Sequence, residues 1–130
     1  VRDLLGDPAA EEKFKNRFAI INVWRSIAGP AIKSPLTCCD AQSVSEENVL
    51  ASERRAKDRI GELELVSYNA EHKWFYFPEM KNNEVLLIKT FDSMNDGRAI
   101  RSIHTAFKNL LAPEDAQPRE SMESRMLAFF

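Results

Sequence analysis

The sequence predicts a mainly β domain with short helices, built as an antiparallel sandwich or barrel of the jelly-roll kind. Three observations support this fold class. The chain has 130 residues, which suffices for one domain at most. Its second half contains several runs rich in β-branched and aromatic residues, one closely after another. The connections between these runs are short and contain turn-forming residues, which is typical of neighbouring antiparallel strands.

The first part of the chain is predicted to hold one short helix and two strands. Helix-forming residues follow Asp7-Pro8, and proline is favoured in the first turn of a helix. The run Arg17–Arg25 (RFAIINVWR) predicts a buried strand. The glycines and prolines of Ser26–Pro35 predict a loop, after which Leu36–Asp40 predicts a short strand.

The middle of the chain is predicted to be charged and exposed before the strands resume. Ser45 precedes two glutamates, a pattern typical of a helix N-terminus. The charged run Ser52–Arg59 predicts a solvated helix face or a mobile loop. Four strands are then predicted, at Glu62–Tyr68, Lys73–Phe77, Glu84–Phe91 and Ala99–Phe107.

The last segment, Arg119–Phe130, fits either a strand or a helix. We favour a strand, because the sheet needs a closing element and a polar inner face suits a charged ligand. The period of two then places one polar set on a single face, namely Arg119, Ser121, Glu123 and Arg125.

Composition excludes several classes of protein. The net charge of −2 argues against a nucleic-acid-binding protein, which needs a clustered basic surplus. No apolar run is long enough to span a membrane and no signal peptide is recognisable, so we expect a cytoplasmic protein. The adjacent Cys38 and Cys39 are expected to be partly buried free thiols on a strand. The chain begins at Val1 rather than methionine, so we expect that residues precede it.

His104 is the first candidate for chemistry. On the predicted strand Ala99–Phe107 it shares a face with small or apolar residues, so one ring nitrogen is available to a metal. A lone histidine on such a face is more often a structural core residue. By contrast His72 lies in a predicted turn beside charged residues, and we expect it to face solvent and to bind no metal.

Two arginines are candidates for binding a carboxylate. The planar guanidinium of Arg119 matches a carboxylate better than a lysine does, and the hydroxyl of Ser121 adds a third hydrogen bond on the same face. Arg125 is the rival on that face, and an exposed edge strand is the plain alternative. The first strand ends in residues that could line a pocket or belong to the core: Asn22, Trp24 and Arg25.

Several stretches taken together resemble one family. They are Arg17–Arg25, His72–Met80, Glu84–Ser93, His104–Phe107 and Pro118–Arg125. The chain resembles the fungal and bacterial hydroxylases and desaturases of secondary metabolism, which include gibberellin desaturase-like and cephamycin hydroxylase-like proteins. The resemblance covers nearly the whole chain.

The resemblance implies a double-stranded β-helix, of which residues 1–130 would be the C-terminal part and hence a partial jelly roll. It implies Fe(II) held by two histidines and a carboxylate, with 2-oxoglutarate as cosubstrate and a small secondary metabolite as substrate. His104 matches the last metal histidine. Arg119 with Ser121 matches the site for the cosubstrate carboxylate, with Arg125 as the alternative.

The sequence departs from this family in one respect that matters for activity. A His-x-Asp pair is expected just upstream of Arg17–Arg25, and the 130 residues contain none. We therefore expect the chain to be inactive alone. Two alternatives stay open: a non-catalytic, degenerate homologue that serves as a binding or partner subunit, and an unrelated small β-barrel that binds a ligand. An open sheet edge also leaves room for a homo-oligomer.

Overall fold

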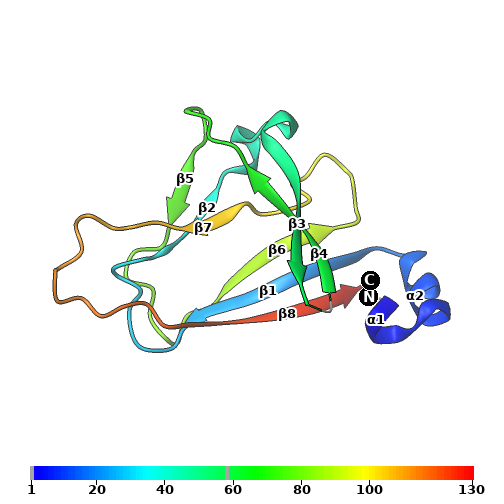
Figure 1. Cartoon of the computed structure of the whole chain (residues 1–130), viewed down its shortest axis with the longest axis horizontal. Coiled ribbons are helices and arrows are strands. Elements are labelled where there is room, and N and C mark those ends of the chain that lie inside the picture. The colour runs from blue at the N-terminus through cyan, green and yellow to red at the C-terminus, as the bar shows by residue number, and fades with distance from the viewer. Residues whose placement is uncertain (1, 58) are drawn as a thin grey trace.

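A computed structural model describes residues 2–57 and 59–130, and it contains mostly strands (Figure 1). The helical elements are α1 (Arg2–Leu5), α2 (Asp7–Phe14) and the 3₁₀ turns η1 (Ala41–Ser43) and η2 (Glu46–Asn48). The strands are β1 (Phe18–Ser26), β2 (Leu36–Cys39), β3 (Val49–Ala56), β4 (Arg59–Val66), β5 (Trp74–Tyr76), β6 (Leu86–Asp92), β7 (His104–Ala106) and β8 (Ser121–Phe129).

The strands form two three-stranded antiparallel sheets and one separate hairpin. The first sheet has the order β6-β1-β8 and the second has the order β5-β2-β7, while β3 pairs only with β4. The chain passes repeatedly from one sheet to the other, as it does in a double-sheet jelly roll. This confirms the predicted fold class, and it places β1 and β2 at the centres of their sheets.

The core lies between the two sheets. Trp24 on β1 and Ile88 on β6 are buried with Ala31 and Met80, and Leu36 of β2 packs against them. Because β1 is the central strand, its side chains alternate between the core and the outer face of the sheet. The predicted strand Arg17–Arg25 is therefore confirmed.

Most of the other predicted elements are confirmed with bounds that differ by a few residues. Helix α2 begins at Asp7 with proline in its first turn, and the Ser45 hydroxyl caps η2 by accepting from the Glu47 amide at 3.4 Å. The free thiols of Cys38 and Cys39 lie on β2, half-buried and buried respectively, as expected. Within the described residues, no helix is both long and apolar enough to cross a membrane.

Two predictions about secondary structure need correction. The run Ser52–Arg59 is neither helix nor loop: most of it belongs to β3, and Asp58 lies outside the described residues. Its charges fit a strand because both faces of the β3–β4 hairpin are largely exposed. The predicted strand Ala99–Phe107 is reduced to the three residues of β7, since the preceding residues run alongside without a continuous ladder.

An ionic cluster fastens one end of the first sheet. Arg17, just before β1, donates two hydrogen bonds to the carboxylate of Asp92 at the end of β6, at 3.1 and 2.8 Å. Lys89 donates a third at 3.2 Å. The hydrogen bonds from Arg17 hold the pKa of Asp92 well below its usual range. This cluster fixes β6 against β1 next to the candidate site.

Candidate functional site

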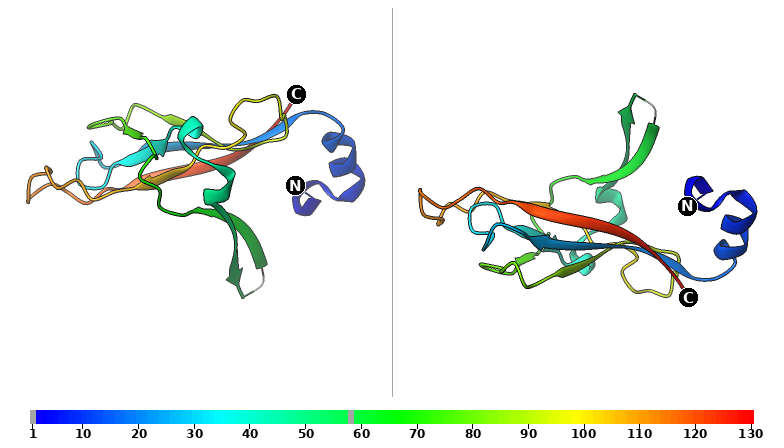
Figure 2. Two further views of the ribbon diagram at one scale, coloured as in Figure 1. Left: turned by 90° about the horizontal axis from the view of Figure 1, so that it is seen from above. Right: turned by 90° about the horizontal axis from the view of Figure 1, so that it is seen from below.

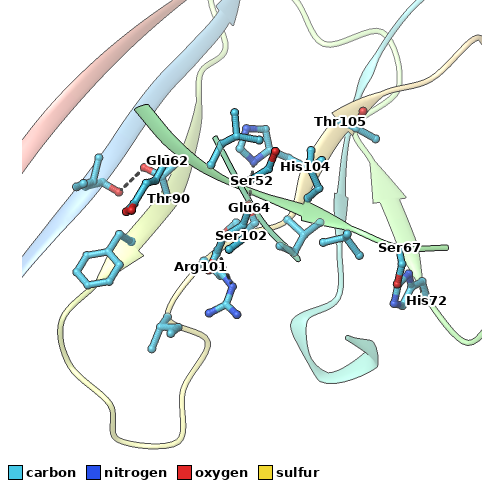
Figure 3. A pocket seen from close by; sticks show the side chains of 18 of the residues that line it. Ser52, Glu62, Glu64, Ser67, His72, Thr90, Arg101, Ser102, His104 and Thr105 are labelled. Carbon is cyan, nitrogen blue, oxygen red and sulfur yellow. Dashed lines mark hydrogen bonds and ion pairs between the residues drawn. The ribbon is translucent and has the colours of Figure 1, made fainter. Parts of the chain in front are cut away.

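A large open cavity lies between the β3–β4 hairpin and the two sheets (Figure 3). Its volume is about 1340 Å³. The hairpin forms one wall, the segment that leads into β7 forms another, and residues from β1, β6 and β8 complete it. Much of the lining is apolar, and its polar members include His104, Arg101 and Arg125. The cavity thus brings together residues that are far apart in the sequence.

The ring of His104 is held in one orientation at this cavity. The residue begins β7 opposite Cys38 of β2, and its side chain is half-buried. Its Nδ1 lies 2.8 Å from the carbonyl oxygen of Ser102. Because a carbonyl can only accept, Nδ1 carries the proton in this hydrogen bond, and in the neutral ring Nε2 then has a lone pair for a metal. This is the tautomer that a metal-binding histidine needs.

Arg125 lies at the same cavity and is oriented by a buried amide. It stands opposite Asn22 in the β1–β8 register, and its Nε donates to Asn22 Oδ1 at 3.0 Å. The other end of that amide donates to Glu123 Oε1 at 2.6 Å. In the described part of the chain the guanidinium is otherwise unengaged, so its two Nη groups are available to a carboxylate.

Arg119 and Ser121 lie away from this cavity. The Arg119 guanidinium stacks over the Trp24 ring, 5.7 Å from its centroid, and donates to the Ser34 carbonyl at 3.0 Å. It precedes β8 rather than belonging to it. Ser121 begins β8 opposite Ser26, half-buried. The structure therefore brings His104 together with Arg125, and it does not bring His104 together with Arg119.

The three predicted pocket residues of β1 fall on different faces. Asn22 and Trp24 share the inner face, and both are almost fully buried. Arg25 is exposed on the outer face, opposite Met122. None of the three lines the large cavity, but Asn22 reaches it indirectly through Arg125.

Two residues at the cavity were not expected from the sequence. His72 does not face solvent as predicted: it is half-buried, and its Nε2 lies 3.2 Å from Asn48 Oδ1. The turn chemistry around it is nevertheless as predicted, since the Asn69 side chain accepts from the Glu71 amide. Arg101 is paired with Glu46 and Glu64. The contacts of His72 and of Arg101 join segments that are far apart in the sequence. The local sequence pattern therefore could not predict them.

The described residues supply an incomplete set of metal ligands. Over residues 2–57 and 59–130, no group of three histidine, cysteine, aspartate or glutamate side chains could hold a metal ion. A facial triad needs two histidines and one carboxylate. His104 has the right tautomer for one of these positions, but alone it does not fit Fe(II).

Comparison with known proteins places the chain among oxidoreductases. A family model described as "Oxidoreductase/YMDC permease-like domain" matches residues 1–129. The hydroxylase/desaturase asaB of Aspergillus flavus is 36% identical over 135 residues, covering 93% of this chain and 59% of that protein. The hydroxylase/desaturase efuI of Hormonema carpetanum is 38% identical over 127 residues, covering 89% and 42%.

A solved structure gives the same result for the fold. The iron and alpha-ketoglutarate-dependent endoperoxidase NvfI superposes with a TM-score of 0.84 at 28% identity, covering 98% of this chain and 47% of that one. The chain thus spans about half the length of the relatives that it matches.

Proposed function

Because this chain belongs to the oxidoreductase family whose model it matches, together with fungal hydroxylase/desaturases, we propose that it is part of an Fe(II)- and 2-oxoglutarate-dependent hydroxylase or desaturase. Its substrate would be a small secondary metabolite. The observation that carries the proposal is that His104, in its metal-binding tautomer, and Arg125 line one cavity.

In this proposal the described residues bind and orient. His104 Nε2 would provide one iron ligand, and the Arg125 Nη groups would hold the distal carboxylate of 2-oxoglutarate. When bound, the iron would activate oxygen for abstraction of a substrate hydrogen. Asn22 would keep Arg125 turned toward the cavity. Asn22, Trp24 and Arg25 do not line this cavity. Their direct contact with the substrate therefore stays a prediction from the sequence.

A direct experiment compares Arg125 with Arg119 as the residue that binds 2-oxoglutarate. The role of Arg119 with Ser121 in binding the cosubstrate carboxylate stays a prediction. We expect Arg125→Ala to weaken 2-oxoglutarate binding by about tenfold to a hundredfold, the size of a charge-assisted hydrogen bond or two. Arg119→Ala should leave the affinity unchanged. Binding would be followed by ligand-detected NMR with Zn(II) present. The reverse ranking of the two variants would assign the carboxylate to Arg119 and Ser121.

Metal binding tests the other half of the site. We expect the chain to bind Zn(II) or Ni(II) weakly and His104→Ala to remove that binding, whereas His72→Ala should retain it. If His104→Ala binds metal as well as the unmodified chain, the assignment of His104 is wrong.

The absence of a three-residue ligand group in the described residues favours a second candidate function. The chain would then be a non-catalytic homologue that binds 2-oxoglutarate or a similar dicarboxylate as a binding or partner subunit. The two candidates differ in turnover once the missing ligands are supplied, because only the first predicts that a longer protein with this chain and a His-x-Asp pair converts 2-oxoglutarate to succinate when Fe(II) and oxygen are present. We expect the 130-residue chain alone to show no such conversion.

We also propose that copies of the chain associate through an open sheet edge, in the cytoplasm. Strand β8 ends the first sheet, and among the described residues no strand pairs with its outer side. An unpaired edge of this length is a template for strand addition. Sedimentation analysis would show a dimer, and a proline at Ser124 should abolish it if β8 is the edge used.

A further inference from the structure

The β3–β4 hairpin stands apart from both sheets and forms a wall of the His104 cavity (Figure 2). Its strands pair with each other along eight residue pairs, from Val49 with Val66 to Ala56 with Arg59, and with no other described strand. An isolated two-stranded hairpin is only marginally stable in water. Its position over the cavity therefore depends on the contacts that fasten it.

Those contacts are few. At the root of the hairpin, Asn48 accepts hydrogen bonds from Asn69 at 3.3 Å and from the Ser67 amide at 2.9 Å. Among the described residues of the strands themselves, one ion pair or hydrogen bond reaches the rest of the chain, from Arg101 Nε to Glu64 Oε2 at 3.0 Å. Arg101 is thus the fastening point beyond the root.

Arg101 is suited to this task by its surroundings. Its side chain is only 14% exposed, and its Nη2 also pairs with Glu46 Oε2 at 2.6 Å. The two carboxylates come from η2, before the hairpin, and from β4 within it. A planar guanidinium can hold two carboxylates at once, whereas a lysine ammonium is a single point charge. Glu64 is less exposed than Glu46, 47% against 84%, so solvent screens the pair to the hairpin less than the pair to η2.

The same segment orients His104. Ser102 follows Arg101 directly, its amide donates to the Lys89 carbonyl on β6 at 2.7 Å, and its own carbonyl accepts from His104 Nδ1. Figure 3 shows Glu64, Arg101, Ser102 and His104 together at the cavity. A displacement of Arg101 therefore acts on the peptide group that sets the histidine tautomer.

We propose that Arg101 is a positioning residue that fastens the β3–β4 hairpin over the cavity and couples that closure to the orientation of His104. Its importance for catalysis rests on the proposed function. The coupling itself is a property of these side chains, and it can be measured without metal or turnover.

The test uses the whole chain and matched variants. Arg101→Gln removes both ion pairs, and Glu64→Gln removes only the one to the hairpin. Arg55→Gln is the control, because Arg55 lies on the same hairpin and pairs with Glu53 beside it, so that its loss breaks no contact to the sheets. Hydrogen exchange reports opening of residues 49–66, and a long-range ¹H–¹⁵N NMR spectrum reports the His104 tautomer.

We expect exchange in the hairpin to rise about twofold to fivefold in both Arg101→Gln and Glu64→Gln, and to stay unchanged in Arg55→Gln. The Nε2–H tautomer of His104 should appear in Arg101→Gln and, to a smaller extent, in Glu64→Gln, and it should not appear in Arg55→Gln. Arg101→Lys, which keeps the charge but reaches one carboxylate, should restore part of the protection.

Unchanged hairpin exchange in Arg101→Gln would overturn the fastening role, and an unchanged tautomer would overturn the coupling. If Arg101→Gln does not fold, Glu64→Gln and Arg101→Lys still decide whether the hairpin is fastened here. A chain that binds no 2-oxoglutarate but shows these changes would refute the proposed function and leave this inference intact.

Discussion

Arg125 on β8 donates its Nε proton to the buried amide oxygen of Asn22 on β1, at 3.0 Å, across a directly paired position of the sheet. The same amide holds the Glu123 carboxylate at 2.6 Å. The neutral amide of Asn22 thus binds both the Arg125 guanidinium and the Glu123 carboxylate, which lie on the same face of β8. That arrangement leaves the end of the guanidinium available to an anion.

Replacing Asn22 by Ala should let Arg125 turn onto Glu123 and neutralise itself. We expect a loss of roughly tenfold in affinity for 2-oxoglutarate, together with about 1–3 kcal/mol of stability from the lost buried hydrogen bonds. Calorimetric titration and urea unfolding measure the two effects.

Adding Glu123→Gln to this variant removes the competing charge, so it should recover most of the affinity but none of the stability. Asn83→Ala on the exposed surface is the control. An Asn22→Ala protein that binds 2-oxoglutarate normally would show that Asn22 does not orient Arg125.

Arg119 is expected to act on stability rather than on binding. Its guanidinium lies over the Trp24 ring and bonds the Ser34 carbonyl, thereby joining the segment before β8 to β1 and the loop that follows it. We expect Arg119→Ala to lower the free energy of unfolding by about 1–2 kcal/mol. Urea denaturation followed by circular dichroism measures this, with exposed Arg54→Ala as the control. An equal loss in both variants would mean that the stacking contributes nothing.

Two glycines give opposite predictions for the same substitution. Gly97 has a φ of 87°, in the left-handed region, and it follows Asn95 and Asp96 in the connection between β6 and β7. Gly97→Ala should therefore destabilise the chain by about 1 kcal/mol. Gly61 has an ordinary backbone, and an added Cβ would lie 3.9 Å from the Arg54 carbonyl oxygen, so Gly61→Ala should be neutral or slightly stabilising. Thermal unfolding of both variants compares them, and equal effects would contradict the turn geometry.

The fold was predictable wherever burial imposes a local pattern. Strand β1 could be predicted because it is rich in the β-branched and aromatic residues of a strand that packs against a core, as Trp24 does, while its neighbour Arg25 faces outward. The charged residues of β3 carry no such pattern, because both faces of the hairpin are largely exposed, and the sequence alone therefore predicts a helix face or a loop there. Strand β7 was overextended because apolar residues such as Ile100 line a cavity without belonging to a ladder.

The candidate site was predictable only in part. His104 could be singled out as a residue type on a strand, but its tautomer depends on the Ser102 carbonyl, which only the backbone path reveals. Both arginines lay on the predicted polar face. The choice between them depends on register, since β8 begins after Arg119 and places Arg125 opposite Asn22. The contacts of Arg101 link segments too distant for any local signal.

The ionic cluster at Asp92 should make stability depend on pH in one direction. Its hydrogen bonds from Arg17, the Met94 amide and Lys89 hold the pKa of this carboxyl below its usual range. An unfolded carboxyl has a pKa of about 3.9, so the unfolded chain binds the proton first as pH falls. The stabilisation is therefore complete above about pH 5 and is lost progressively below about pH 4.

Asp92→Asn removes the charge and should lower the urea midpoint at pH 7, and it should lower the midpoint by a smaller amount at pH 3. The difference between the two proteins should stay constant from pH 7 down to about pH 5 and should shrink progressively below about pH 4. Asp115→Asn, at an exposed position, provides the control for a change in net charge. A difference that is constant with pH would show that Asp92 stabilises the sheet through packing and hydrogen bonds that do not depend on its ionisation.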